Sequence, residues 1–429
     1  MEHNLKIIVF DDDPTGSQTV HGCSLLLDFS SNNLKAGLAD SGPLLFLITN
    51  SRALEPAQVV ELFTTICKRL KPLLAELNRP WLVVSRGDST LRGHTPLEQE
   101  LICSLLGPFH ANLLVPAFPQ GGRTTLAGQH LLHGEPVHLS PFGKDRRFAY
   151  SSSDLGQWLE FKSGGRLKAA RIKNLHAADS LADLAAGEWT VVDAQTPQDL
   201  DDLGKSLRQE LLEAGKRHFC QSAASLLNGL AQIPAIQFSL AQLPPRQGPG
   251  LVLVGSYVPL ADQQLELLLA EPSCRGVEFP VDQWLANPAS KPLELGLQRQ
   301  QLSAIAAAGL TPVLFSSRGE RPAISADQQN QLALAMAELA LSLPPPLAYL
   351  IAKGGTTSFT LLRDGLGLER LRLLGQLLPG LSLLQAQPAH PIWGEMPIVT
   401  FPGNLGDANS LKKCWQLLDN AAVNKKGGI

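Results

Sequence analysis

Short, continuous apolar runs that alternate with helix-period segments constrain this chain most. In the first half, the apolar runs occupy residues 6–10, 44–50, 81–85 and 112–118. Between them, residues 56–77 carry apolar side chains at helical spacing, and residues 96–107 begin with proline and end at glycine. Strands that are apolar throughout and separated by helices are typical of a parallel sheet that is covered on both faces.

The same plan restarts in the second half of the chain. Residues 241–250 contain three prolines and two glycines and are interpreted as a linker. The apolar runs that follow occupy residues 250–256, 311–317, 347–355 and 396–404. A chain of 429 residues is also longer than one hydrophobic core usually organises. We therefore expect an α/β fold with two α/β domains, residues 1–242 and 250–429. Each should have a largely parallel sheet covered by helices, with the active site in the interdomain cleft.

The composition excludes several classes of partner. The net charge is −3, with 44% hydrophobic and 17% charged residues, so nothing indicates binding to nucleic acid or to an anionic membrane. No apolar run approaches the ~18 residues of a membrane span, and the N-terminus lacks the apolar core of a secretory signal. The six cysteines are scattered singly, which predicts reduced thiols and no zinc or redox motif. We expect a cytoplasmic protein that binds small molecules and that could form a homo-oligomer.

Three consecutive aspartates follow the first apolar run, in the stretch IIVFDDDPTG. Asp11, Asp13 and Thr15 fit the D-x-D-x-T pattern of haloacid-dehalogenase-like phosphatases, and residues 44–50 resemble the second motif of those enzymes. That scheme also needs a late pair of acids to hold Mg²⁺, and the segment around Asp88 has leucine and arginine where the second acid should lie. A turn that caps a helix is a third, purely structural interpretation, although it needs fewer acids.

Polar residues also follow the other strand-like runs of the first half. Because ligands collect beyond the carboxyl ends of parallel strands, these residues should gather at one edge of the sheet. Arginine presents a planar fork of donors that suits carboxylates and phosphates, and aspartate can accept from sugar hydroxyls. The candidate ligands for a polyhydroxy acid are Arg52, Arg86, Asp88 and Arg92. Other residues that could line the same pocket are His21, His94 and Arg123.

Three glycine-containing turns follow apolar runs of the second half, at residues 254–256, 353–358 and 402–407. Glycine lets backbone N–H groups approach a phosphate closely, and serine and threonine hydroxyls add donors. No Walker A loop is present, because Asp199 stands where the first glycine of such a loop would be needed upstream of residues 203–206. The turns therefore predict a nucleotide site that is built without a Walker A loop.

The order of these stretches resembles that of the four-carbon acid sugar kinase family. They are FDDDPTGSQTVHG, TNSR, RGDSTLRG, PAFPQGGRTT, KGGTTS and PGNLGD, and they extend over nearly the whole chain. The resemblance implies an N-terminal domain that binds a sugar acid and a C-terminal domain that binds ATP. The implied reaction transfers the γ-phosphoryl group, with ATP and Mg²⁺, to the terminal hydroxyl of a tetronate or 3-oxo-tetronate.

The resemblance also implies residue roles. The family's paired acids fall on Asp12 and Asp13, of which one would take the proton of the attacking hydroxyl as a general base. Arginines of the candidate pocket would hold the substrate carboxylate. The implied ATP contacts are Ser256, Gly354, Gly355, Thr356, Thr357 and Gly403.

Two departures from the family pattern leave the kinase assignment standing. An extra aspartate precedes the paired acids, and Thr356 stands where many members have aspartate. The particular sugar acid therefore stays undefined. The alternatives are a phosphatase that uses Asp11 and Asp13, and a non-catalytic protein that senses a sugar acid or a nucleotide.

Overall fold

The computed structural model describes residues 5–17, 19–234, 236–243, 246–286, 291–319 and 325–423. The chain divides into two compact units, Met1–Ala235 and Ile236–Ile429, which are described separately below. Two prolines of the predicted linker, Pro244 and Pro245, lie outside the described residues. Among the described helices, none is long and apolar enough to cross a membrane.

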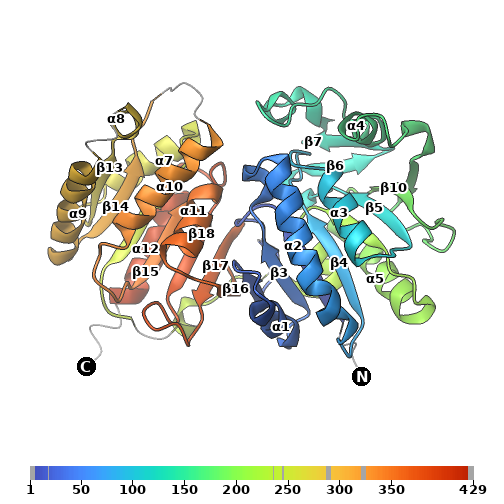
Figure 1. The fold of residues 1–429 in the computed structure, drawn as a ribbon. Helices are drawn as coiled ribbons and strands as arrows, with labels where there is room; N and C mark the ends of the chain where they lie inside the picture. Colours follow the sequence, from blue (N-terminus) through green and yellow to red (C-terminus); the bar gives the residue numbers. More distant parts are fainter. Residues whose placement is uncertain are drawn as a thin grey trace. The chain divides into compact units, whose positions relative to one another are not determined.

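The first unit is built on a parallel sheet (Figure 1). In order across the sheet, its strands are β2 (Cys23–Leu26), β3 (Leu44–Ile48), β1 (Lys6–Asp11), β4 (Trp81–Arg86), β11 (Phe219–Ser222), β5 (Ala111–Val115), β10 (Glu188–Asp193) and β9 (Lys173–His176). Each neighbouring pair is parallel. All residues of β1 and β3 are buried, which agrees with the continuous apolar runs that predicted them.

Helices pack against this sheet. α1 (Ser31–Ala39), α2 (Pro56–Ala75) and α3 (Leu97–Leu106) pack side by side (Figure 1). Their buried side chains share one apolar core with β1, β3 and β4. α4 (Leu155–Lys162) belongs to a smaller core with β5 and β10, and α5 (Pro197–Ala214) packs against α6 (Leu226–Ala231). A small antiparallel sheet of β6 (Arg123–Leu126), β7 (Gln129–Leu132) and β8 (Glu135–Pro136) completes the unit.

The second unit has a largely parallel sheet with an antiparallel end. Its strands, in order, are β13 (Cys274–Phe279), β14 (Thr311–Ser316), β12 (Gly250–Val254), β15 (Tyr349–Lys353), β18 (Pro397–Phe401), β17 (Leu381–Ala386) and β16 (Arg370–Leu378). The pairs from β13 to β18 are parallel, whereas β17 runs antiparallel to both β18 and β16. The predicted α/β fold class, with largely parallel sheets covered by helices, is therefore confirmed.

The helices of the second unit are α7 (Pro259–Leu269), α8 (Val281–Ala286), α9 (Lys291–Ala307), α10 (Ala326–Ala340), α11 (Gly355–Thr360) and α12 (Ser410–Val423). A short π-helix, η7 (Leu361–Gly365), continues α11. α7 and α12 share a core with strands β12, β15 and β18. Residues 236–238 also belong to this unit, because Phe238 N–H donates to the carbonyl of Gln376 (2.8 Å) in β16. The expected domain boundary at residue 242 stays a prediction.

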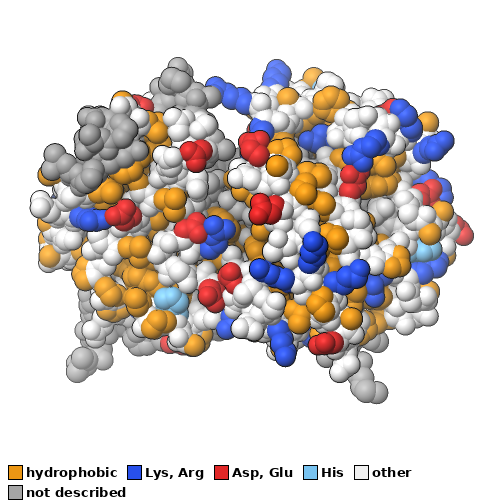
Figure 2. Space-filling model, viewed as in Figure 1, with side chains coloured by type: hydrophobic (Ala, Val, Ile, Leu, Met, Phe, Trp, Pro, Cys, Tyr) orange, Lys and Arg blue, Asp and Glu red, His pale blue; other side chains and the backbone are white. Residues whose placement is uncertain are grey.

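On the face shown in Figure 2, side chains of both charge signs are interspersed with apolar ones. No single sign of charge dominates that view, as the net charge of −3 suggests. Interspersed charges of this kind keep a protein dispersed in water and do not create a strong field over the surface.

Candidate active site

The triple-aspartate segment lies where three adjacent strands end. β1 is flanked by β3 and β4, and Asp11 is in register with Ile48 on one side and Arg86 on the other. The backbone N–H of Asp12 donates to the carbonyl of Arg86 (3.2 Å), which fixes the turn that leaves β1. Because the three strands are parallel, the residues that follow each of them meet at one edge of the sheet, as the sequence predicted.

Arg52 clamps the two acids that follow Asp11. Its Nε and Nη2 donate to the two carboxylate oxygens of Asp12 at 3.1 and 2.6 Å, and its Nη1 donates to Asp13 at 3.1 Å. Both Asp12 oxygens thus face a planar fork, the strong geometry for an arginine–carboxylate pair. The carboxylates raise the pKa of Arg52 further above its ordinary value, against the opposing effect of burial. The structure therefore pairs Arg52 with the acids, where the sequence prediction had assigned it to a substrate carboxylate.

Asp11 is the innermost acid. Its side chain has no exposed surface, and Arg86 Nη1 donates to its Oδ1 at 3.0 Å. Burial raises the pKa of Asp11 to about 7, although the Arg86 charge acts in the opposite direction. Gly16 covers this pair so closely that a Cβ there would meet Arg86 Nη1 at 2.1 Å. Asp11 is therefore buried beneath the more exposed acids of the segment, and its Oδ2 has no hydrogen-bond partner among the described residues.

Asp12 and Asp13 differ in environment although they are adjacent. The Asp12 side chain is 3% exposed and that of Asp13 is 23% exposed. Burial raises the pKa of Asp12 in spite of Arg52. At Asp13, burial also acts to raise the pKa, but the charges of Arg52 and Arg86 and the hydrogen bonds from Thr15 outweigh it and lower the pKa. Asp13 thus stays ionised and accessible, whereas Asp12 is the more basic of the two.

Asp88 anchors the loop after β4. Arg92 Nε donates to its Oδ2 at 2.7 Å, and the hydroxyl of Thr90 donates to the same oxygen. Burial acts to raise the pKa of Asp88, but the charges of Arg52 and Arg92 outweigh it and hold the pKa well below its usual range. Arg92 also lies 3.8 Å from the carboxylate of Asp145. The four predicted sugar-acid ligands are thus brought into one cluster with the paired acids, and each is already engaged in an ion pair.

The other three pocket candidates, Arg123, His94 and His21, differ from these four in their surroundings. Arg123 donates to the carbonyl of Gly121, and its buried Nε has no hydrogen-bond partner in the part of the chain described. His94 is held by the carbonyl of Leu54 at 2.9 Å, and burial lowers its pKa to about 4, so the ring is neutral. Burial also lowers the pKa of His21. Arg123 thus keeps a buried donor without a partner among the described residues, as Arg86 also does at its Nε.

Three residues of this region were missed by the sequence prediction. Glu98, in the first turn of α3, is 5% exposed, and burial together with the Asp12 charge raises its pKa to about 7. Lys162, at the end of α4, donates to the carbonyl of Gly93 at 2.9 Å. His130 is fully buried and braces the Asp88 loop, with its Nε2 2.8 Å from the carbonyl of Ser89. In the sequence, the only indication that Glu98 belongs to this region was its closeness to the polar loop that follows β4.

The second unit brings its three glycine turns together around Ser256. A Cβ on Gly403 would meet the Ser256 hydroxyl at 2.6 Å, and one on Gly354 would meet the Ser256 nitrogen at 3.1 Å. A Cβ on Gly255 would meet Thr357 Oγ1 at 2.1 Å. Gly354 also has a φ of +114°, which only glycine adopts readily. The turns predicted as nucleotide contacts therefore form one compact patch, and glycine is required where they touch.

Hydroxyl and backbone groups line this patch. Gly355, Thr356 and Thr357 are all partly exposed, as is Ser256, so their polar groups can reach a ligand. The hydroxyl of Ser358 is used internally, because it donates toward the carbonyls of Ala352 (2.9 Å) and Gly354 (2.7 Å). The structure gives no contact that distinguishes Thr356 from the aspartate expected there.

Two cations near the patch were not singled out from the sequence. Arg318, which follows β14, donates to the carbonyl of Ser256 and to the carboxylate of Asp262 at 3.1 Å. Lys353, the last residue of β15, is fully buried and donates to the carbonyls of Pro402 (2.9 Å) and Gly403 (3.0 Å). A lysine that ends an otherwise apolar strand was a local signal that the prediction overlooked.

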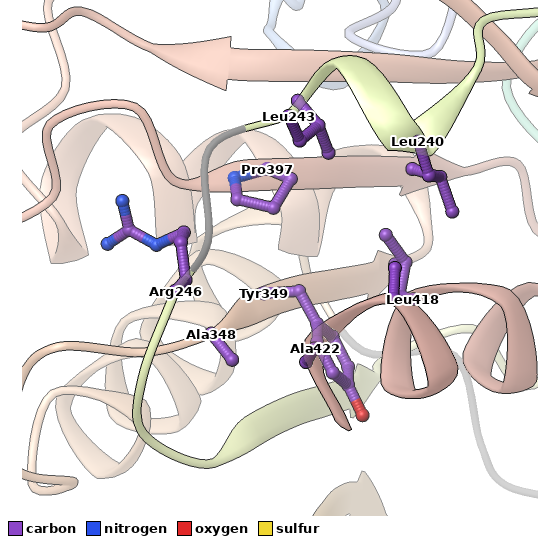
Figure 3. Close-up of a pocket in the computed structure, with 9 residues that line it drawn as sticks. Leu240, Leu243, Arg246, Ala348, Tyr349, Pro397, Leu418 and Ala422 are labelled. Atoms are coloured by element: carbon purple, nitrogen blue, oxygen red, sulfur yellow. The ribbon is translucent and has the colours of Figure 1, made fainter. Parts of the chain in front are cut away.

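A separate pocket of the second unit contains none of the predicted site residues. Its lining is largely apolar and comes from β15, β18, α12 and the segment after residue 239 (Figure 3). Arg246 lies at one end of the pocket and donates to the carbonyls of Leu347 (3.1 Å) and Gly394 (2.6 Å). This pocket is distinct from the glycine turns, and the hydroxyl of its Tyr349 donates to Asp419 at 2.9 Å.

Comparison with known proteins supports the division of chemistry between the two halves. Residues 7–230 match the family model described as a sugar-binding N-terminal domain, and residues 251–411 match the one described as a nucleotide-binding C-terminal domain. The acid–arginine cluster falls within the first match and the glycine turns within the second.

Curated relatives carry kinase names. The chain is 28% identical to a D-threonate kinase of Cupriavidus necator over 340 residues, which cover 77% of this chain and 78% of that protein. It is 26% identical to a D-erythronate kinase of Heliobacterium modesticaldum over 61% of this chain and 60% of that protein. A D-threonate kinase of Salmonella typhimurium is 23% identical over 95% of this chain and 97% of its own length.

Solved structures share the fold. A structure from Salmonella typhimurium LT2 matches with a TM-score of 0.69 and 18% identity, over 96% of this chain and 98% of that chain. A Haemophilus influenzae protein matches with a TM-score of 0.63 and 15% identity, over 96% and 100%. The family models match both halves of the chain, and the chain therefore belongs to the four-carbon acid sugar kinase family.

Proposed function

We propose that the protein transfers the γ-phosphoryl group of ATP to the terminal hydroxyl of a four-carbon sugar acid, such as a tetronate or 3-oxo-tetronate. One observation carries the proposal. The same chain combines an acid–arginine cluster within its sugar-binding match with converging glycine turns within its nucleotide-binding match. The names of the relatives, D-threonate kinase and D-erythronate kinase, support the choice of substrate class.

Asp12 is the proposed general base. Its pKa is raised by burial, so its carboxylate accepts a proton more readily than that of Asp13. Gly93 lies beside Asp12, since a Cβ added at Gly93 would be in van der Waals contact with Asp12 Oδ2, at 3.5 Å. A substrate hydroxyl that donates to this oxygen would lose its proton as the bond to phosphorus forms. Arg52 would keep the carboxylate oriented and stabilise its negative charge until then.

The substrate carboxylate is proposed to bind the cationic side of the cluster. Arg86 and Arg92 lie within it, and Arg123 keeps a buried Nε without a hydrogen-bond partner in the described residues. An anionic ligand would satisfy that donor. Asp88, whose pKa is held low by Arg52 and Arg92, would accept hydrogen bonds from the sugar hydroxyls.

ATP is proposed to lie on the glycine turns, with its phosphates near Ser256, Gly354 and Gly403. Among the described residues, no group of three or more His, Cys, Asp and Glu side chains could hold a metal by itself. Kinases usually hold Mg²⁺ through one or two carboxylates together with the substrate phosphates. Asp13, ionised and partly exposed, could supply such a carboxylate. When bound, Mg²⁺ would neutralise charge on the transferred group.

The test is ADP release from Mg-ATP, measured with D-threonate, L-threonate, D-erythronate and 3-oxo-tetronates. Butyrate, a four-carbon acid without hydroxyls, is the matched control. Release that depends on one of the hydroxy acids and not on butyrate supports the kinase. A protein that binds ADP and the acids but forms no ADP from ATP would instead be a sensor.

The phosphatase alternative is tested in the same series with p-nitrophenyl phosphate and no ATP. The buried position of Asp11 argues against it, because the first acid of the D-x-D-x-T pattern must attack phosphorus directly and here has no exposed surface. Hydrolysis of the ester, together with ADP release from none of the acids, would refute the kinase proposal.

A further inference from the structure

Lys353 touches all three glycine turns of the nucleotide-binding unit. Its carbonyl accepts the N–H groups of Gly255 (2.9 Å) and Ser256 (3.3 Å). It directly precedes Gly354 in the second turn, and its Nζ donates to the carbonyls of Pro402 and Gly403 in the third. One residue therefore sets the spacing of the three turns.

The amine of Lys353 is buried, and no carboxylate of the described residues lies in an ion pair with it. Its side chain is fully buried, and its Nζ lies 4.1 Å from the centroid of the Phe401 ring in β18. The groups that act on it electrostatically are Arg318, which follows β14, and Cys414 in α12. Burial raises the pKa of the Cys414 thiol, which keeps it neutral, and Arg318 repels a second positive charge.

Such a site favours the neutral amine until an anion arrives. Burial, and next the charge of Arg318, lower the pKa of Lys353 to about 7. A neutral amine has two N–H groups, which match the two loop carbonyls that it contacts. A negatively charged ligand on the turns would favour the protonated form, because an opposite charge raises the pKa of an amine.

We propose that Lys353 is a positioning residue that fixes the three turns. When a nucleotide binds, the amine of Lys353 takes up a proton from solvent and supplies the buried positive charge that faces the phosphates of the nucleotide. This inference rests on the proposed binding of nucleotide to the glycine turns. It goes beyond the proposed function because it predicts that nucleotide affinity depends on pH and assigns that dependence to one side chain. A lysine that merely braced the loop would serve equally well as a neutral amine and would take up no proton.

The test is calorimetric titration of the full-length protein with Mg-free ADP near pH 8, in two buffers of different ionisation enthalpy. At that pH an amine with a pKa of about 7 is roughly nine-tenths neutral, and ADP is almost fully ionised. We therefore expect uptake of close to one proton for each ADP bound by the wild type. Lower uptake is expected near pH 6, where the amine is already charged.

Three variants separate charge from packing. Lys353→Met should take up no proton and bind ADP at least tenfold more weakly. Lys353→Arg keeps a permanent charge, so it should regain most of the affinity without proton uptake. Lys412→Met, which removes a partly exposed lysine of the same unit, should keep the affinity and the proton uptake of the wild type.

The possible outcomes are distinct. Wild-type binding of ADP without proton uptake overturns the role of Lys353 and leaves the proposed kinase standing. Failure of the wild type to bind ADP at all overturns both. If Lys353→Met does not fold, as judged by thermal melting, Lys353→Arg decides the question: proton uptake by the wild type and none by this variant supports the assignment, and equal uptake by both overturns it.

Discussion

Gly255→Ala is the substitution whose effect follows most directly from the geometry of the second unit. The added Cβ would lie 2.1 Å from Thr357 Oγ1 and 2.8 Å from both its Cβ and its Cγ2. These distances are far below van der Waals contact, so the turn that carries Thr357 must retreat by roughly 1 Å. Overpacking of this kind typically costs about 1–3 kcal/mol. If the cost falls on the nucleotide-bound state, ADP affinity drops by about 5- to 150-fold.

The matched control is Gly296→Ala in α9. A Cβ there meets nothing within 4 Å, and its backbone is helical. The same chemical change should therefore leave ADP affinity unchanged and stabilise the protein by about 0.5–1 kcal/mol, since alanine is the better helix former. Urea unfolding and ADP titration of both variants provide the comparison. Wild-type affinity and stability in Gly255→Ala would refute the packing of the turns as described.

Three further predictions concern the first unit. Asp12→Asn should lower kcat by about 100-fold or more, as expected for loss of a general base, while ADP affinity stays within twofold. Asp13→Asn should also lower kcat. Near-normal kcat in both variants would exclude these acids from catalysis. Glu98→Gln should flatten the dependence of stability on pH. The folded-state pKa of Glu98 is raised to about 7, so its stabilisation is complete below about pH 4.5 and is lost as pH rises through 7. Equal slopes of unfolding free energy between pH 5 and 8 in variant and wild type would contradict this. His130→Ala should destabilise the protein by about 2–4 kcal/mol in urea unfolding, because two buried hydrogen bonds disappear; a change below 0.5 kcal/mol would show that the ring is dispensable.

Features that depend on local sequence were predictable. The apolar runs gave the strands that carry the site, because β1 and β3 are buried along their whole length and so show no alternation. The polar residues that follow those runs had to meet at one edge, since the strands are parallel. The glycine turns were visible for a similar reason, because each ends an apolar strand.

Pairing between distant residues was not predictable. Arg52 is 40 residues from Asp12, and Arg86 is 75 residues from Asp11, so no local pattern indicates which acid each arginine meets. The prediction consequently treated the arginines as available for substrate, whereas the structure engages them with aspartates. The burial of Asp11 depends on Gly16 and on the neighbouring strands and is equally non-local.

The antiparallel pair β16–β17 and the role of Lys353 were missed for different reasons. β16 alternates partly buried and buried residues, but its sequence RLRLLGQLL has adjacent leucines and so shows no clean period of 2. Lys353 belongs to a quoted motif, yet its importance depends on the carbonyls of residues about 50 positions later. Only the folded chain shows that its amine lies beneath the turns.

The central claim is phosphoryl transfer to a sugar acid, and ³¹P nuclear magnetic resonance tests it most directly. The wild-type protein would be incubated with Mg-ATP and D-threonate or D-erythronate, with Asp12→Asn in parallel. The account predicts a new phosphomonoester signal that grows as the γ-phosphate signal of ATP declines, and its near absence with the variant. Inorganic phosphate as the only new signal, or no change with any sugar acid, would contradict it.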